Sequence, residues 1–87
     1  MNFSEALELI KQGKKLTRTG WNGAKMFVYY VRGSEFAVNR APLIDMFANG
    51  TIIKYRPHID LKAVDGTCGV WSISNNDVLA NDWEVVE

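Results

Sequence analysis

The sequence predicts an α+β domain: a small antiparallel sheet of about four to five strands, an N-terminal amphipathic helix, and one or two further short helices. Three observations support this class. Apolar residues near the N-terminus recur at helical spacing, the run Met26–Val31 is continuously apolar, and residues 58–63 alternate between polar and apolar before a turn signal. All 87 residues are expected to form one domain, 1–87.

The first helix is expected close to the N-terminus. Asn2 is a good N-cap, and Glu5 three residues later completes a capping box. Gly13 provides the C-terminal stop. Apolar residues at i, i+3, i+4 and i+7 then form one face that can cover a sheet, namely Phe3, Ala6, Leu7 and Ile10.

A strand at Lys15–Arg18 leads into the turn Gly20-Trp21-Asn22-Gly23, and a second strand follows at Met26–Val31. The second strand has no polar face, which predicts a helix on one side and a partner subunit on the other. In the turn, Trp21 offers a stacking surface and Asn22 a donor and an acceptor. The alternative is a tight turn whose Trp21 folds back onto the core.

The middle of the chain gives weaker signals. Arg32–Phe36 is expected to be a turn region, and Pro42–Phe47 a short helix that ends before Gly50. Thr51–Tyr55 has the composition of a short strand, whereas Pro57 cannot donate a hydrogen bond within a central strand.

The alternating stretch from His58 to Ala63 predicts a half-buried strand, and Asp65-Gly66 predicts a two-residue hairpin turn. The register that follows pairs Val64 with Thr67, Leu61 with Val70, and Asp60 with Trp71. Trp71 is then expected on the polar face, near His58. An indole in that position needs internal packing, a subunit contact or a ligand to explain it.

The C-terminal part predicts a short helix and a last strand. Ser74 can cap a helix over Asn75–Ala80, with Asp77 three residues after the cap. The strand Trp83–Val86 follows, and Trp83 is expected in the core.

Charge and cysteine content exclude several classes of protein. Ten basic and ten acidic residues cancel, which argues against a nucleic-acid polymer or an anionic membrane as partner. Cys68 is the single cysteine, so an internal disulfide and a multi-cysteine zinc site are excluded. No apolar run has transmembrane length and the N-terminus lacks a signal-peptide pattern, so an intracellular setting is expected.

Catalytic signals are weak. His58 and Cys68 have no recognised nucleophile–base spacing, and the predicted register puts them on opposite faces. Asp60 and Asp82 could act as paired carboxylates only in principle. No phosphate-binding loop is present, and no cofactor or metal is expected. Aromatic and amide side chains are the tools of nucleotide recognition, so a small-ligand binding module or an interaction protein is favoured over an enzyme.

Several motifs together resemble the phage family of Thoeris anti-defence protein 2. They span nearly the whole chain, although Arg32–Tyr55 matches little of the family pattern. The matching residues are Phe3-Ser4-Glu5-Ala6-Leu7, Lys11, Gly13, Arg18, Gly20-Trp21-Asn22-Gly23, Pro57-His58-Ile59, Lys62, Asp65-Gly66, Trp71, Ser74, Asp77, Leu79-Ala80 and Asp82-Trp83.

The resemblance implies a sponge that sequesters an immune signal in the cytoplasm of the infected bacterial host. The expected ligand is glycocyclic ADP-ribose, made by a TIR-domain enzyme to activate the Thoeris effector; some relatives also bind cyclic oligonucleotides. The protein is expected to hold the ligand intact and to form a homotetramer with pockets between subunits. No nucleic-acid polymer and no membrane are expected as partners.

Six residues are assigned ligand-binding roles under this hypothesis. Trp21 would stack on adenine, Asn22 would read a base edge or a ribose hydroxyl, and Arg18 would pair with the pyrophosphate. The others would close the pocket or bind ribose, namely Trp71, Asn75 and Asp77. For Trp71 and Asp77, hairpin packing and helix capping are the alternatives. An enzyme that degrades the signal, and a phage protein that binds another protein, are the competing functions.

Overall fold

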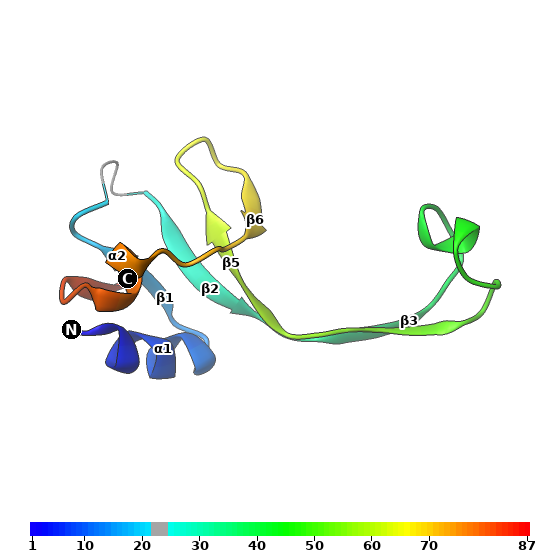
Figure 1. Cartoon of the computed structure of the whole chain (residues 1–87), viewed down its shortest axis with the longest axis horizontal. Helices are drawn as coiled ribbons and strands as arrows, with labels where there is room; N and C mark the ends of the chain where they lie inside the picture. The colour runs from blue at the N-terminus through cyan, green and yellow to red at the C-terminus, as the bar shows by residue number, and fades with distance from the viewer. Residues whose placement is uncertain (22–24) are drawn as a thin grey trace.

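The computed structural model describes residues 1–21 and 25–87, and it confirms the α+β class (Figure 1). A five-stranded antiparallel sheet has the strand order β6-β5-β2-β1-β7, and a separate pair of strands, β3 and β4, projects from it. The helices and sheet strands are α1 (Phe3–Lys11), β1 (Lys15–Arg18), β2 (Phe27–Val31), β5 (His58–Lys62), β6 (Cys68–Val70), α2 (Asn75–Leu79) and β7 (Trp83–Val86).

Helix α1 begins with the predicted capping box. The Asn2 side chain accepts from the Glu5 N–H at 2.9 Å, and the Glu5 carboxylate accepts from the Asn2 N–H at 3.2 Å. The helix ends at Lys11, Gln12 is its C-cap, and Gly13 follows directly with a φ of +95°, which favours glycine. The expected apolar face splits in two. Ala6 and Ile10 are fully buried against the sheet, while Phe3 and Leu7 lie beside them at a groove described below.

The core lies between α1 and one face of β1, β2 and β7. Leu16 and Val28, which lie opposite each other on β1 and β2, are fully buried. Trp83 at the start of β7 is 1% exposed, as expected for a core residue. The helix expected over one face of β2 is therefore confirmed, whereas the partner subunit expected on the opposite face stays a prediction.

Strands β2 and β5 continue into an arm built from β3 (Ser34–Ala37) and β4 (Ile52–Tyr55). Val31 lies opposite His58, and Ser34 lies opposite Tyr55, so the register runs on without an inserted residue. Regular pairing stops between these pairs because Pro57 has no N–H to donate. The arm makes the molecule elongated, with extents of 47 × 26 × 25 Å (Figure 1).

The structure corrects one expectation in this region and refines another. Arg32–Phe36 was expected to be a turn region, but Ser34–Ala37 is a strand because it pairs along its whole length with Ile52–Tyr55, the strand that composition did predict. The helix expected at Pro42–Phe47 shrinks to a single 3₁₀ turn, η1 (Leu43–Asp45). Val38, 1% exposed, is buried within the distal part of the arm.

The register predicted for the β5–β6 hairpin is wrong by one residue. Asp60 lies opposite Val70 rather than Trp71, because the connection is a three-residue loop closed by the Ala63 N–H to Thr67 carbonyl bond of 2.8 Å. Gly66, with φ +89°, provides the left-handed residue that such a loop requires. A shift of one residue exchanges the two faces. Trp71 therefore packs against the core, and Val70 is 74% exposed.

The C-terminal elements agree with expectation. Ser74 caps α2 by accepting from the Asp77 N–H at 3.1 Å. The chain then turns into β7, which pairs with β1 and also receives the N-terminus, since the Met1 ammonium donates to the Trp83 carbonyl at 2.8 Å. None of the helices formed by the described residues has the length and apolar character needed to cross a membrane.

Candidate ligand-binding site

Four aromatic side chains from distant parts of the sequence form an aromatic cluster, defined here as Phe3, Trp21, Trp71 and Trp83. Trp21 and Trp83 meet edge to face with ring centroids 5.2 Å apart. Trp71 lies 6.4 Å from Trp21 and 5.9 Å from Trp83, again edge to face. Phe3 closes the cluster at 5.4 Å from Trp83. Such contacts add to the stability that burial of the rings already provides.

A charged network borders the aromatic cluster and centres on Arg18. Its Nη1 donates to Asp77 Oδ1 and its Nε donates to Asp82 Oδ1, both at 2.7 Å. The side chains are 13–30% exposed, so water screens these pairs only in part. Arg18 thus ties β1 to α2 and to the residue before β7.

Asp82 also accepts hydrogen bonds from the residues that follow β1, at the start of the glycine-flanked turn. The Gly20 N–H donates to Asp82 Oδ2 at 2.8 Å, and the Thr19 hydroxyl donates to the same oxygen at 3.2 Å. A Cβ on Gly20 would lie 2.9 Å from that oxygen and 3.1 Å from Arg18 Nη2. A side chain at this position would therefore push the Asp82 carboxylate and the Arg18 guanidinium away from their present positions.

Asp77 joins the charged network to the aromatic cluster. Its Oδ1 accepts from the Trp21 indole Nε1 at 3.0 Å as well as from Arg18. Its backbone carbonyl accepts from Trp83 Nε1 at 2.9 Å. Asp77, whose carboxylate the sequence assigned to a capping box, therefore fixes the orientation of Trp21.

The network lowers the pKa of both carboxyl groups. Hydrogen bonds from Arg18, followed by those from Gly20 and Thr19, lower the pKa of Asp82 from 3.8 to about 2. Burial works to raise the pKa of Asp77, but hydrogen bonds from Arg18 and Trp21 outweigh it and the net shift is downward. Asp82, followed by Asp77, raises the pKa of Arg18, so all three groups are charged at neutral pH.

These shifts predict the stability of the domain in acid. A carboxyl whose pKa is lower when folded stabilises the fold fully above its unfolded pKa, and that contribution is lost as the pH falls through the folded value. The melting temperature should therefore fall between about pH 4 and about pH 2. Asp82→Asn should show a smaller fall over this interval, measured by circular dichroism. The control is Glu84→Gln, which removes the same charge at an exposed position on β7; its melting temperature should fall as far as that of the unmodified chain. If the melting temperature of Asp82→Asn fell equally far, Asp82 would not be the source of the acid sensitivity.

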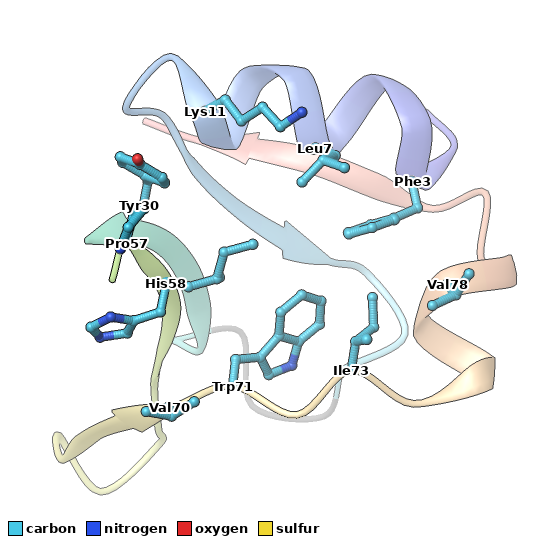
Figure 2. A pocket seen from close by; sticks show the side chains of 11 residues that line it. Phe3, Leu7, Lys11, Tyr30, Pro57, His58, Val70, Trp71, Ile73 and Val78 are labelled. Atoms are coloured by element: carbon cyan, nitrogen blue, oxygen red, sulfur yellow. The ribbon is translucent and has the colours of Figure 1, made fainter. Parts of the chain in front are cut away.

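An apolar groove of about 500 Å³ opens beside the aromatic cluster, where α1 leaves the β5 and β6 part of the sheet uncovered (Figure 2). Figure 2 shows Trp71 at its floor, with Phe3, Ile73 and Val78 toward one end and Tyr30, Pro57 and His58 toward the other. The lining residues are Phe3, Leu7, Lys11, Tyr30, Pro57, His58, Ile59, Val70, Trp71, Ile73 and Val78.

The structure brings four of the six predicted site residues together. Arg18, Trp21 and Asp77 are joined by hydrogen bonds, and Trp71 lies against Trp21 and lines the groove. Asn75 is exposed in the first turn of α2, without a contact that joins it to the other four. Asn22 lies outside the described residues.

Sequence reasoning missed Phe3 and Asp82 as members of this region. The helical spacing assigned Phe3 to a core face, and Asp82 was considered as a partner for Asp60; both residues also belong to the motifs that carry the family resemblance. Asp82 instead pairs with Arg18, while Asp60 Oδ1 lies 3.1 Å from His58 Nε2 on β5. The usable signal was the family resemblance, because the local sequence does not show the β1–β7 pairing that brings Asp82 to Arg18.

The corrected register also changes the relation between His58 and Cys68. Both lie on the same face, since Cys68 is opposite Lys62. They remain about 13 Å apart along the sheet, because Lys62 lies four positions after His58 on β5 and each position adds about 3.3 Å. Tyr29 lies on this face too; its hydrogen bond with Cys68, then burial, raises the pKa of Tyr29 to about 12.

Among residues 1–21 and 25–87, no three His, Cys, Asp or Glu side chains are placed to hold a metal ion.

Comparison with known proteins identifies the family. The model of the Thoeris anti-defense 2-like domain matches residues 1–86. The chain belongs to this family. It is also similar to the protein Thoeris anti-defense 2 of Bacillus phage SP01, with 37% identity over 90 residues that cover 99% of this chain and 94% of the phage protein.

Family membership confirms the resemblance inferred from the motifs. The Thoeris anti-defense 2-like match runs across the arm as well as the sheet. The arm is therefore part of the family domain, although sequence reasoning found little there to match.

Proposed function

We propose that the chain is a non-catalytic sponge that sequesters a cyclic ADP-ribose-type immune signal, glycocyclic ADP-ribose, and so keeps the Thoeris effector inactive. Residues 1–87 would form a single cyclic-nucleotide-sequestering domain acting in the cytoplasm of the infected bacterial host. The observation that carries the proposal is an aromatic-lined groove in a Thoeris anti-defense 2-like domain. Its volume of about 500 Å³ is within the usual range for small-ligand sites.

The groove supplies the contacts that bind a base. A base stacked on an aromatic side chain gains about 1–3 kcal/mol, whereas nanomolar binding requires about 12 kcal/mol. Several groups must therefore converge on one ligand. Trp71 would provide the stacking surface, and Trp21, Asn22 and Asn75 would contact the ligand from the loop and the helix beside it.

The contacts of Arg18 change the role proposed for it. Its guanidinium is already bound to Asp77 and Asp82 at 2.7 Å. Arg18 and Asp77 would therefore position Trp21 rather than meet the pyrophosphate and ribose directly. Lys11 lines the groove, is 58% exposed and has only a long, exposed ion pair with Glu8 at 3.7 Å, so it would be the cation that reaches a phosphate.

The absence of ordinary catalytic geometry supports a sponge over a degrading enzyme. Within the described part of the chain, the single histidine and the single cysteine do not lie at contact distance, and the carboxylates of the site are bound by Arg18. A sponge needs affinity and abundance but no nucleophile. We further propose that the chain forms a homotetramer, and that cyclic oligonucleotides are a second ligand class to test.

Release of the ligand after denaturation tests the proposal. The protein is incubated with glycocyclic ADP-ribose, separated from free ligand and heat-denatured, and the released molecule is identified by mass spectrometry. Intact ligand is expected. A cleaved product would establish the enzyme, and no retained ligand together with no thermal shift across a panel of cyclic nucleotides would favour the protein-binding alternative. At 100-fold excess over its dissociation constant, a ligand should add about 2.7 kcal/mol of stability.

A substitution in the groove tests whether the ligand binds there. Trp71→Ala is expected to weaken ligand binding about 5- to 150-fold, the loss of one stacked aromatic surface. Binding is measured by titration calorimetry at a temperature where circular dichroism shows the variant to be folded. Val64→Ala, in the exposed β5–β6 loop, is the matched control and should bind as the unmodified chain does. Unchanged binding by Trp71→Ala would remove the groove as the site.

A further inference from the structure

The face of the five-stranded sheet opposite α1 carries aromatic side chains that the proposed function does not use. Leu16 and Val28 face α1 and are fully buried. Because side chains alternate along a strand, Phe27 and Tyr29 of the middle strand β2 lie on the other face. Both are partly exposed, and their ring centroids are 5.8 Å apart. Aromatic rings in this arrangement form a surface on which other flat rings can stack.

Two lysines from the neighbouring strands flank this aromatic surface. Lys15 Nζ on β1 lies 5.1 Å from the centroid of the Phe27 ring, and Lys62 Nζ on β5 lies 5.6 Å from it. In the described part of the chain, neither ammonium group has a carboxylate within 4.0 Å. The two cations therefore share one ring and repel each other, and an anion bound between them would offset that repulsion.

Positive charge continues along β5 into β4 on the same side of the strands. The register of β2 with β5 runs on into that of β3 with β4, so even-numbered positions share one side, namely Lys54, Arg56, His58, Asp60 and Lys62. The only carboxylate in this row is occupied within it, because Asp60 Oδ1 lies 3.1 Å from His58 Nε2. The zero net charge argued against a nucleic-acid polymer as partner, but it averages over the whole chain and does not describe this face.

We propose that this face binds single-stranded nucleic acid, with bases stacked on Phe27 and Tyr29. The adjoining phosphates lie at Lys15 and Lys62. Aromatic surfaces flanked by basic groups bind single strands with little sequence preference, whereas a duplex keeps its bases inside the helix. Charge favours this partner over a second copy, because two copies meeting through this face would bring lysines against lysines. Trp71, at the floor of the groove, packs on the opposite face, so the proposal does not rest on the sponge.

The salt dependence of binding tests the phosphate contacts. Fluorescence anisotropy is measured with labelled oligouridylate and oligothymidylate of about 12 nucleotides. If Lys15, Lys62 and Arg56 each neutralise one phosphate, the logarithm of the association constant should fall against the logarithm of the salt concentration with a slope of about −2. Affinity should then drop roughly 20-fold between about 50 and 200 mM salt. Lys15→Gln and Lys62→Gln should each reduce the slope by about 0.7. Lys14→Gln, which removes an exposed lysine just before β1, is the control and should leave the slope unchanged.

Loss of the aromatic ring tests the stacking contact. Phe27→Leu keeps an apolar side chain but removes the flat ring, so it should weaken binding at least about fivefold and leave the salt slope unchanged. If circular dichroism shows this variant to be unfolded, Tyr29→Leu replaces it.

Three results would overturn the proposal: no binding of either oligonucleotide at low salt, tighter binding of a duplex of the same length, or a salt slope that the Lys15 and Lys62 variants do not change. Light scattering on the same variants identifies the alternative occupant, because a fall in mass would make this face a contact between copies. Retention of glycocyclic ADP-ribose plays no part in these measurements, so failure of the sponge proposal is recognised separately.

Discussion

Trp83→Ala is expected to remove a large share of the stability of the domain. Trp83 is 1% exposed, contacts Phe3, Trp21 and Trp71, and donates its indole N–H to the Asp77 carbonyl. Loss of a buried tryptophan costs about 3–5 kcal/mol, against a total of about 5–15 kcal/mol for a typical domain. The melting temperature, followed by circular dichroism, should fall by at least about 12 °C.

Two further variants separate packing from hydrogen bonding at this position. Trp83→Phe keeps much of the ring volume but leaves the Asp77 carbonyl without the indole donor, so it should lose about 1–3 kcal/mol. Leu79→Ala, which truncates a side chain 76% exposed, should stay within about 0.5 kcal/mol of the unmodified chain. A fall of less than about 5 °C for Trp83→Ala would mean that the aromatic cluster is not the centre of the core.

Local signals in the sequence predicted the elements of the fold well. The capping box, the glycine after α1 and the β-rich runs each act over a few residues, and α1, β1, β2, α2 and β7 begin and end within one or two residues of the expected positions. These features depend on backbone geometry and hydrogen bonds that a short peptide already specifies.

The hairpin register shows where local reasoning fails. Asp65-Gly66 fits both a two-residue turn and a three-residue loop, and the two differ by one position in every pair that follows. Burial decides between them. With the three-residue loop, Trp71 joins Ile59 and Leu61 over the core; with the two-residue turn, its indole would face away from it. The apolar content of the partner strands, rather than the turn itself, therefore fixes the face.

The arm and the charged network depend on long-range contacts, which one sequence does not reveal. Ser34–Ala37 has no strong strand pattern, and it is a strand because Ile52–Tyr55 continues the ladder of β5 beside it. Arg18 and Asp82 are 64 positions apart, and β1–β7 pairing brings them together. Arg18, Trp21, Trp71 and Asp77 therefore share one region, but their mutual contacts, and the engagement of Arg18 by two carboxylates, emerge only from the fold.

Asp77→Ala is expected to destabilise the domain and weaken ligand binding together. The change leaves the Trp21 indole N–H without its acceptor and Arg18 with only one of its two carboxylates, in a region where Arg18 is 17% exposed. A buried polar group left unsatisfied costs about 1–3 kcal/mol, so a loss of about 2–3 kcal/mol is expected from urea unfolding. Trp21 would then no longer be oriented, and ligand affinity should fall with it.

Asp77→Asn distinguishes a positioning role from direct contact with a ribose hydroxyl. The amide oxygen can still accept from Trp21, so stability should fall by only about 1 kcal/mol, the charge-assisted part of the Arg18 bond. If Asp77 acts through Trp21, binding across the series of aspartate, asparagine and alanine should follow the loss of stability. If Asp77→Ala instead abolished binding at unchanged stability, the carboxylate would be a ligand contact, and Arg18 would have to release it when the signal binds.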